Sequence, residues 1–383
     1  MTDTRPVILT LLGVFQPGFD ATGPNQSLLR MVEALGDRFR FRVIARALPD
    51  DVPGRWTTLH GVDRLPLARG RPMLRGLRDA INTTPHDLIV SNGLFDMELT
   101  VPALAMRRAG LIAGTPMMVA PRGEFSPGAL AIKGGRKRAF LRVAGLTGLL
   151  GGVSVQATGT EERDHLRAAL PRSGPILIGP NVRTLPALPA RADGPVDGPL
   201  KVAFLSRIDR KKNLDFALDA LAAVASPVEF AIYGPVTDDA FWAECQAKIA
   251  AIPARHRVIV HGAIPQTDVP AALAASDLFF LPTLGENYGH SIVDALAVGT
   301  PVLISDRTPW TGLEAAGAGW DLALDNTAQF TRAIETVARS DYPARQVRRS
   351  AARAFIERAL DPAQAASELE QCFRTAMSSV KRS

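Results

Sequence analysis

Two acidic residues, Glu286 and Asp294, stand eight positions apart in a segment whose apolar pattern changes from strand to helix. The apolar run 278–281 is typical of a buried strand, and helical spacing of apolar residues over 292–297 predicts a helix that starts near position 289 or 290. Carboxylates near a helix start accept hydrogen bonds from hydroxyl groups and repel phosphates. The pair therefore indicates sugar or ribose binding, although Glu286 as a helix cap and Asp294 as a solvated acid is an open alternative.

The residues between the two acids add backbone donors to this segment. Backbone N–H groups of a loop and a first helical turn have no intrahelical partners, so they can bind sugar hydroxyls or a phosphate. The four residues expected to supply these contacts are Asn287, Tyr288, Gly289 and His290.

Two basic residues, Arg207 and Lys212, lie five positions apart between the expected strand 201–205 and a helix that runs to position 225. A guanidinium fork and an ammonium point charge on one such loop can converge on a pyrophosphate. We expect the neighbouring Arg210 and Lys211 to be solvated, or to supplement the same field.

These residues must be positioned by strand–loop–helix units of a parallel sheet. The segment 278–305 predicts a strand, a loop, a helix and a second strand, which is a right-handed βαβ unit. Ligands of such sheets collect at the carboxyl ends of the strands. The strand 230–233 ends at Gly234 at the same edge.

The segment resembles the acidic signature of family 4 of the retaining, sugar-nucleotide-dependent glycosyltransferases. That signature has two glutamates separated by seven residues, then an Ala-rich helix and Gly-x-Pro, which is Gly299-Thr300-Pro301 here. This chain has Asp294 at the second acidic position. The family also places Gly on either side of its Arg–Lys pair, where this chain has Ser206 and Asn213.

The resemblance implies the GT-B fold, an α/β fold of two doubly wound, Rossmann-like domains that face each other across a cleft. It implies that Arg207 and Lys212 neutralise the diphosphate of the donor, that Glu286 holds a hydroxyl of the donor sugar, and that Asp294 holds the ribose. Strand ends such as that at Gly234 would border the base pocket. The sequence contains no Asp-x-Asp, so we expect no metal and no other cofactor.

The N-terminal half has weaker signals of the same kind. A first loop that contains Gly23 opens onto a helix with apolar spacing, and it resembles the family loop that meets the donor phosphates and sugar. Arg122 and Glu124 follow the expected strand 117–120. Arg122 is a hypothetical contact for an acceptor phosphate or sugar, with Glu124 beside it; a salt bridge between the two is an equally open alternative. The family histidine of this region is absent.

At 383 residues the chain is long enough for two domains. We expect an acceptor-side domain over 1–182, a Pro-, Ala- and Gly-rich linker over 183–199, a nucleotide-sugar domain over 200–365, and a helix over 366–383 that returns toward the first domain. Its two cysteines, Cys245 and Cys372, fit neither a disulfide framework nor a metal pattern, which favours the reducing cytoplasm. No apolar run approaches the ~18 residues of a membrane span.

Charge is distributed unevenly along the chain. Residues 1–180 hold 23 Lys and Arg against 15 Asp and Glu, whereas the chain as a whole has a net charge of +6. The basic residues Lys133, Arg136, Lys137, Arg138 and Arg142 precede an apolar, Gly-spaced run. Two interpretations of this arrangement are open: a solvated helix before a buried strand, and peripheral contact with an anionic membrane on the inner face of the plasma membrane. No nucleic-acid motif is present.

The resemblance therefore implies a retaining glycosyltransferase that moves a hexosyl group from a nucleotide sugar to a glycan or lipid-linked acceptor, and it suggests a role in surface polysaccharide or lipopolysaccharide synthesis. A sugar-nucleotide epimerase or phosphorylase of the same fold stays open. So does a non-catalytic scaffold that binds sugar nucleotides. Release of a nucleoside diphosphate that depends on an acceptor separates the first reading from the others.

Overall fold

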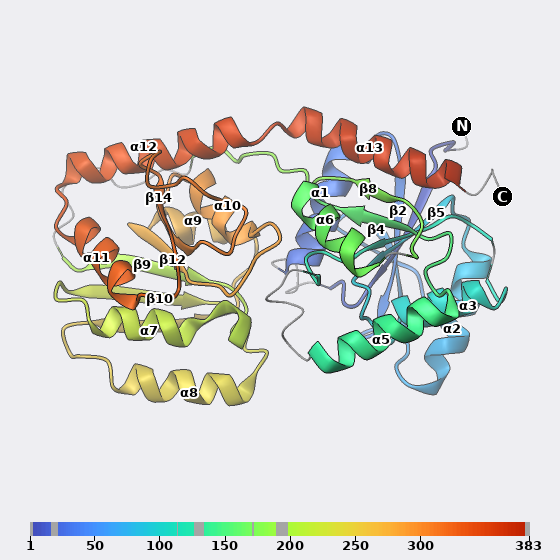
Figure 1. Cartoon of the computed structure of the whole chain (residues 1–383), viewed down its shortest axis with the longest axis horizontal. Coiled ribbons are helices and arrows are strands. Elements are labelled where there is room, and N and C mark those ends of the chain that lie inside the picture. Colours follow the sequence, from blue (N-terminus) through green and yellow to red (C-terminus); the bar gives the residue numbers. More distant parts are fainter. Residues whose placement is uncertain are drawn as a thin grey trace. The chain divides into compact units, whose positions relative to one another are not determined.

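The computed structural model describes residues 3–16, 22–112, 114–125, 134–170, 172–188 and 198–379, which form two compact units (Figure 1). The N-terminal unit comprises Met1–Arg183 and Pro362–Ser383, and the C-terminal unit comprises Thr184–Asp361. The N-terminal unit is thus discontinuous in the chain. Much of the expected linker, at 189–197, lies outside the described residues.

A parallel sheet forms the centre of the N-terminal unit. In the described residues its strands are β1 (Val7–Leu12), β2 (Arg40–Arg46), β3 (Thr57–Leu59), β4 (Val62–Leu67), β5 (Leu88–Asn92), β6 (Met117–Ala120), β7 (Ser154–Ala157) and β8 (Ile176–Ile178). Their spatial order is β3-β4-β2-β1-β5-β6-β7-β8, and only the β3–β4 pairing is antiparallel. Such buried parallel strands read as continuous apolar runs, as in the VILTLL of β1.

Helices cover both faces of this sheet because side chains alternate between the faces along each strand. Leu9 and Leu11 of β1 point into one core, and Ile8 and Leu12 point into the other. The helices are α1 (Gly23–Leu35), α2 (Arg71–Thr83), α3 (Thr100–Arg108), α5 (Gly134–Thr147), α6 (Thr160–Ala169) and α13 (Pro362–Ser378). Helices α1 and α13 contribute to the second of these cores.

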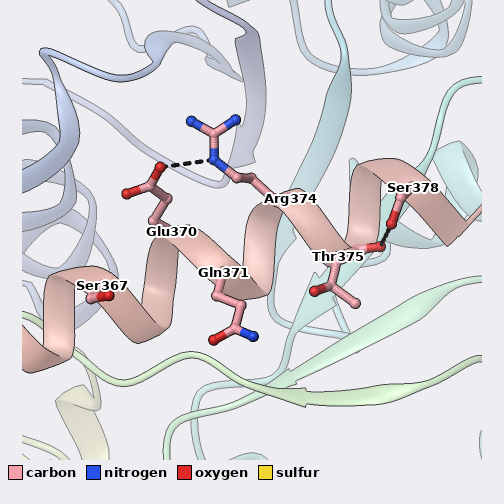
Figure 2. Close-up of a pocket in the computed structure, with 6 residues that line it drawn as sticks. All are labelled: Ser367, Glu370, Gln371, Arg374, Thr375 and Ser378. Carbon is pink, nitrogen blue, oxygen red and sulfur yellow. Dashed lines mark hydrogen bonds and ion pairs between the residues drawn. The ribbon is translucent and has the colours of Figure 1, made fainter.

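Helix α13 is held in the N-terminal unit by its apolar face and by ion pairs at its margin. Phe373 is fully buried and packs edge-on against Phe39, with ring centroids 5.8 Å apart. Glu370 forms an ion pair with Arg38. It also pairs with Arg374, at 2.8 Å (Figure 2). A shallow polar depression on this helix is lined by Ser367, Glu370, Gln371, Arg374, Thr375 and Ser378. Its two charged side chains, Glu370 and Arg374, are paired with each other.

The segment from β3 to α2 was not predicted from the sequence. Strand β4 contains Arg64, which interrupts the apolar run although its side chain is buried. Arg64 donates to both carboxylate oxygens of Asp51, at 2.7 and 2.6 Å. These hydrogen bonds lower the pKa of Asp51 to about 2. A bidentate pair satisfies a buried charge, so a charged residue can occupy a core strand position.

The C-terminal unit has a second parallel sheet. In the described residues its strands are β9 (Leu200–Leu205), β10 (Val228–Tyr233), β11 (Arg257–Gly262), β12 (Leu278–Leu281), β13 (Val302–Ser305) and β14 (Gly319–Leu322). They lie in the order β11-β10-β9-β12-β13-β14. The order therefore reverses between β9 and β12, which makes this the switch point of the sheet.

The helices of the C-terminal unit pack on this sheet around one core. They are the 3₁₀ turn η1 (Arg210–Lys212), α7 (Leu214–Ala222), α8 (Asp239–Ala250), α9 (Val269–Ala274), α10 (His290–Ala297), α11 (Thr327–Ala338) and α12 (Tyr342–Ala359). Helix α10 is buried over 292–297, as expected for a helix that is apolar on nearly every side. Within the described ranges no helix is both long and apolar enough to cross a bilayer.

Candidate functional site

Three of the predicted donor residues of the C-terminal unit lie on loops at the switch point between β9 and β12. The loop after β9 carries Arg207 and Lys212, and the loop after β12 carries Glu286. Crevices at such points are the usual ligand sites of open α/β sheets.

The loop after β9 is shaped by two polar side chains. Asp209 caps η1 by accepting a hydrogen bond from the backbone N–H of Lys212, at 3.2 Å. Asn213 adopts a left-handed backbone with φ 61°, and its amide donates to the carbonyl of Pro282 at 2.9 Å. Asparagine tolerates this conformation better than most residues. The bond to Pro282 ties the two loops together.

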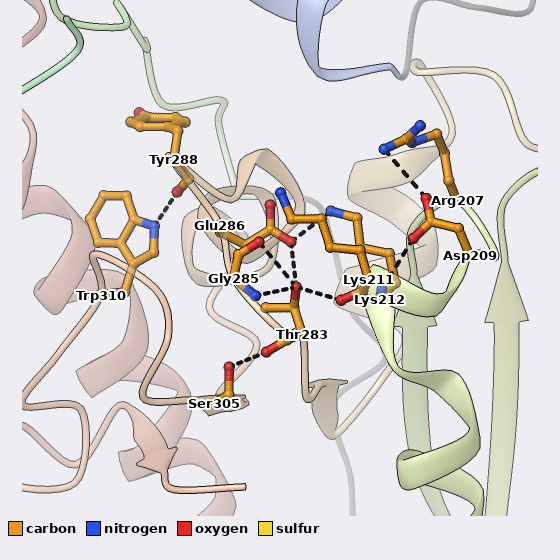
Figure 3. Close-up of polar contacts among 10 residues, drawn as sticks. All are labelled: Arg207, Asp209, Lys211, Lys212, Thr283, Gly285, Glu286, Tyr288, Ser305 and Trp310. Carbon is orange, nitrogen blue, oxygen red and sulfur yellow. Dashed lines mark hydrogen bonds and ion pairs between the residues drawn. The ribbon is translucent and has the colours of Figure 1, made fainter. Parts of the chain in front are cut away.

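Lys212 and Glu286 form the centre of the site. The ammonium of Lys212 lies 2.6 Å from Glu286 Oε1, and their side chains are 12% and 11% exposed (Figure 3). Burial alone would raise the pKa of Glu286, but the charges of Lys212 and Lys211 and the hydrogen bonds lower it below its usual value. Glu286 is therefore an ionised acceptor at neutral pH.

Thr283 supports this carboxylate and was missed in the sequence. It is fully buried, and its hydroxyl lies 2.9 Å from Glu286 Oε1 and 3.1 Å from the carbonyl of Lys211. Its own carbonyl accepts a hydrogen bond from Ser305 at 2.6 Å. A hydroxyl residue directly after the breaking Pro282 was the only available signal. Thr283 thus fixes the rotamer of Glu286.

Lys211 was expected either to be solvated or to supplement the field of Arg207 and Lys212, and its position fits the second alternative. Its side chain is partly buried, and Figure 3 shows it running beside that of Lys212 toward Glu286. Burial lowers the pKa of Lys211, while Glu286 opposes this effect and Lys212 adds to it. Within the described part of the chain its ammonium forms no ion pair, unlike that of Lys212. The site therefore holds Lys211 as a further cation beside Lys212.

Arg207 lies at the edge of this network. Its guanidinium is 3.4 Å from Asp209, its side chain is 49% exposed, and Figure 3 shows it apart from Glu286. The convergence of Arg207 with Lys212 on one point is thus looser than predicted. In the described residues no group of three His, Cys, Asp or Glu side chains could hold a metal ion.

The alternative interpretation of the two acids is wrong for both. The N-cap of α10 is Gly289, without a side-chain cap, so Glu286 does not cap this helix. Asp294 is only 3% exposed, so it is not a solvated acid. It lies in the second turn of α10, whereas Glu286 lies in the loop before it. The structure brings Glu286 to Lys212 and leaves Asp294 within the buried helix.

The residues between the acids form a tight turn. Gly289 has φ 74°, and a Cβ there would lie 2.8 Å from Ile292 Cδ1. Tyr288 accepts a hydrogen bond from the indole of Trp310 through its carbonyl. The rings of Tyr288 and His290 pack edge-on at 4.9 Å, and Asn287 is partly exposed beside them.

Gly234 follows β10 at the same edge of the sheet. A Cβ at Gly234 would lie 1.9 Å from the carbonyl oxygen of Ser206, and its φ is 133°. The backbone of this strand end therefore approaches the loop that carries Arg207 so closely that only glycine fits.

The predicted residues of the N-terminal unit lie at its own sheet edge. Gly23 is the first residue of α1. Arg122 donates to Asn92 and Asn181, at 3.1 and 2.9 Å. Glu124 instead accepts a hydrogen bond from the backbone N–H of Leu94 at 2.6 Å. The predicted alternative of a salt bridge between Arg122 and Glu124 is therefore wrong, because the two side chains bind different partners.

The two units, each a mainly parallel sheet covered by helices, define the GT-B fold. Sucrose-phosphate synthase of Thermosynechococcus elongatus superposes with a TM-score of 0.75 at 16% identity, over 97% of this chain and 99% of that one. The HepE protein of Anabaena, in complex with UDP and glucose, gives 0.72 at 18% identity, over 97% of this chain and 100% of that one. At these identities the likeness concerns the fold alone.

A family match covers the unit that holds the Lys212–Glu286 pair. Residues 190–355 match the family model described as "Glycosyl transferases group 1". A 2-deoxystreptamine glucosyltransferase of Streptomyces kanamyceticus is 30% identical over 108 residues. That stretch is 28% of this chain and 28% of the relative, so the chain matches only about a quarter of the relative's length.

Proposed function

We propose that the protein is a retaining, metal-independent glycosyltransferase that moves a hexosyl group from a nucleoside diphosphate sugar to a glycan or lipid-linked acceptor. We assign it to surface polysaccharide synthesis at the cytoplasmic side of the membrane. The observation that carries the proposal is the buried Lys212–Glu286 pair at the switch point of the unit that matches the glycosyltransferase model. HepE, which shares the fold, binds UDP and glucose.

The chemistry assigned to the site follows from charge. When the bond from the sugar to the diphosphate breaks, negative charge grows on the leaving phosphate. Lys212, Lys211 and Arg207 supply positive charge on that side, where electrostatic stabilisation lowers the barrier. Glu286, ionised and oriented by Thr283, accepts a hydrogen bond from a hydroxyl of the donor sugar, and Asp294 is assigned to the ribose. No proton transfer is required of either acid.

The variant Glu286→Gln separates catalysis from donor binding. It removes the charge that neutralises Lys212 and keeps the size of the side chain. We expect UDP to bind at least as tightly as to the wild type, while the acceptor-dependent release of UDP from UDP-glucose falls at least tenfold. Equal turnover in the two proteins contradicts the role of Glu286. If no nucleoside diphosphate among UDP, GDP and ADP binds the wild type, the proposed function itself is wrong.

A scaffold or an epimerase is the competing class. A scaffold binds UDP-sugar without turnover for any acceptor, and an epimerase interconverts sugar nucleotides without releasing UDP. A preformed cation cluster on the leaving-group side favours cleavage of the sugar–phosphate bond, and therefore the transferase. Release of UDP measured with and without a mixture of lipid-linked and glycan acceptors distinguishes the three.

We also propose that α5 rests on an anionic membrane surface. Val143 and Leu146 are 58% and 82% exposed on this helix, and Arg136, Arg138 and Arg142 are exposed beside them. Apolar side chains flanked by basic ones suit an interface with anionic lipid. Lys133, the first of the predicted basic residues, lies outside the described residues.

Flotation with liposomes tests this contact. The wild type should float with vesicles that contain phosphatidylglycerol and not with phosphatidylcholine alone. The double variant Val143→Ser with Leu146→Ser should lose most of this binding. Val347→Ser, at a position 71% exposed on α12, is the matched control and should float like the wild type. Equal flotation of all three proteins rejects α5 as the contact.

A further inference from the structure

The N-terminal unit has a switch point of its own, and a cluster of polar side chains lies there. Strand β1 is flanked by β2 on one side and β5 on the other, so the strand order reverses between β1 and β5. Four residues meet beside this point, from α1, the end of β5, the turn after β6 and the segment after β8. We call Ser27, Asn92, Arg122 and Asn181 the Arg122 cluster.

The hydrogen bonds of the cluster use the side-chain oxygens of both asparagines as acceptors. Arg122 Nε donates to Asn92 Oδ1 at 3.1 Å, and Arg122 Nη1 donates to Asn181 Oδ1 at 2.9 Å. Ser27 Oγ also donates to Asn181 Oδ1, at 3.1 Å. Because each amide oxygen faces the guanidinium or the hydroxyl, the amide nitrogens face elsewhere. Both asparagines act as acceptors for the cation and keep their own donors.

Two donors of this cluster are left over. Arg122 Nη2 and Asn92 Nδ2 are buried and make no hydrogen bond within the described residues, and Asn92 as a whole is 8% exposed. Buried donors without acceptors are costly and rare in folded proteins. Here two such donors belong to residues that are hydrogen-bonded to each other. Together they indicate a position where a ligand supplies the missing acceptor.

The charge of Arg122 is also left without a close partner. Within the described residues it forms no ion pair, and Glu162, whose charge acts on it, uses its oxygens on Gly123 N–H and on Thr158, at 2.6 to 2.8 Å. Burial lowers the pKa of Arg122 to about 10, which leaves it cationic at neutral pH. The ligand that completes the cluster is therefore an anion.

The backbone of Arg122 supports a functional reading. Its φ is 52°, in the left-handed region that a long side chain rarely adopts. Such residues concentrate at ligand sites, where the surrounding structure holds them. The conformation directs the guanidinium into the cluster, and away from Glu124.

We propose that the Arg122 cluster is an oxyanion site that binds a phosphate group of the acceptor, an inference that rests on the proposed transferase function. A guanidinium with amide donors matches the geometry of phosphate oxygens. The diphosphate of the donor is already assigned three cations in the C-terminal unit. The basic excess of residues 1–180 favours an anionic substrate for the N-terminal unit.

The variant Asn92→Asp in the full-length protein tests the site without removing Arg122. Aspartate has the size of asparagine and keeps an acceptor for Arg122 Nε, but it places a carboxylate where the anion binds. Gln371→Glu is the matched control, because it makes the same charge change on exposed α13 of the same unit. Melting temperatures show that both variants fold; Asn92→Asp should melt no lower than the wild type.

Titration calorimetry with farnesyl phosphate, farnesol, glucose 6-phosphate and UDP gives the readout. The wild type and Gln371→Glu should bind a phosphate monoester saturably, and Asn92→Asp should bind it at least tenfold more weakly. Farnesol should bind at least tenfold more weakly than farnesyl phosphate if the phosphate is on a lipid, and glucose 6-phosphate should be the better ligand if it is on a sugar. The affinity for UDP should be the same in all three proteins.

Three results would overturn the proposal. In the first, the wild type binds neither phosphate monoester. In the second, Asn92→Asp binds the monoesters as tightly as the wild type does. Either result means that the cluster has only a structural role. If Asn92→Asp weakens UDP and neither monoester, the anion belongs to the donor and not to the acceptor. Failure of the transferase function is a separate result, since it appears as no binding of any nucleoside diphosphate to the wild type.

Discussion

The two switch points of this molecule occupy the same place in their sheets and have opposite electrostatics. In the C-terminal unit the carboxylate of Glu286 is neutralised by Lys212 at 2.6 Å. In the N-terminal unit Arg122 is bound by two neutral amides, and Glu124 binds backbone N–H groups. Desolvation raises the pKa of Glu124 to about 7, whereas the pKa of Glu286 is lowered.

The difference shows that a shared framework fixes where a ligand binds and not which ligand. In the C-terminal site the central cation, Lys212, is already paired with Glu286, and Lys211 is a second cation that has no ion pair within the described residues. The N-terminal site keeps a cation uncompensated, so its stability depends more on what it binds. The predictions below test this contrast, from the largest expected effect to the smallest.

Removing the central cation should have the largest effect. Lys212→Met takes away positive charge from the leaving phosphate, and turnover should fall on the order of 100- to 1000-fold, as when a preorganised donor is deleted. Lys201→Met, at an exposed position of β9, is the matched control and should keep turnover within about twofold. Near-normal turnover of Lys212→Met would contradict the assignment of Lys212 to the leaving phosphate.

The glycines at the two sheet edges should differ in their tolerance of a methyl group. A Cβ at Gly234 meets the backbone oxygen of Ser206 at 1.9 Å, while a Cβ at Gly93 meets the side-chain atom Glu124 Oε1 at 3.0 Å. Both have positive φ. We expect Gly234→Ala to cost about 3 kcal/mol and Gly93→Ala about 1–2 kcal/mol of unfolding free energy, measured by urea denaturation. Equal losses would show that the side chain of Glu124 is as rigid as backbone.

The carboxyl of Glu124 should make stability fall as pH rises. Its pKa is raised in the folded protein to about 7, so between roughly pH 4.5 and pH 7 the folded state holds a proton that the unfolded state has lost. Glu124→Gln removes this dependence. Relative to the wild type, the variant should gain roughly 2 kcal/mol between pH 5 and pH 8.

Thermal melts of both proteins at the two pH values measure this gain. Glu161→Gln, at an exposed position in the first turn of α6, carries the same charge change and should show no such gain. A difference between wild type and Glu124→Gln that is independent of pH would mean that Glu124 is ionised throughout.

The smallest effect is expected at Lys211. Its ammonium has no ion pair in the described residues, so it is available to the donor without breaking a contact. Lys211→Met should weaken UDP binding about fivefold, with turnover reduced less than in Lys212→Met, because one more charged contact is lost from an already cationic site. Calorimetry with UDP measures it, again with Lys201→Met as the control. If the affinity for UDP is unchanged, the only role left for Lys211 is to help neutralise the carboxylate of Glu286.

The sequence predicted β6, four strands of the C-terminal sheet (β9, β10, β12 and β13) and the loops that carry Glu286 and Lys212, because continuous apolar runs and breaking residues such as Pro282 mark them. It did not predict β4, since the Arg64–Asp51 pair hides a core strand behind a charged residue. The pattern of apolar and polar residues along a sequence does not show that two charged residues such as Arg64 and Asp51 are buried as a pair.

The site was less predictable because side-chain direction depends on local backbone geometry. The 3₁₀ turn after β9 brings Lys211 inward, and nothing in four basic residues out of six distinguishes an inward lysine from a solvated one. The left-handed φ of Arg122 separates it from Glu124, although the two are only two residues apart. Thr283 supports Glu286 through contacts that appear only once both loops are in place.

Helix α13 has a consequence for the order of synthesis. It supplies Leu369, Cys372 and Phe373 to the core of the N-terminal unit, yet it is translated after the whole of the C-terminal unit. During synthesis the C-terminal unit can therefore fold before the N-terminal unit is complete. Until α13 is made, one face of the N-terminal sheet has exposed apolar side chains. A polypeptide that ended at residue 361 would contain the complete C-terminal unit, but its N-terminal unit would expose the apolar side chains that α13 buries.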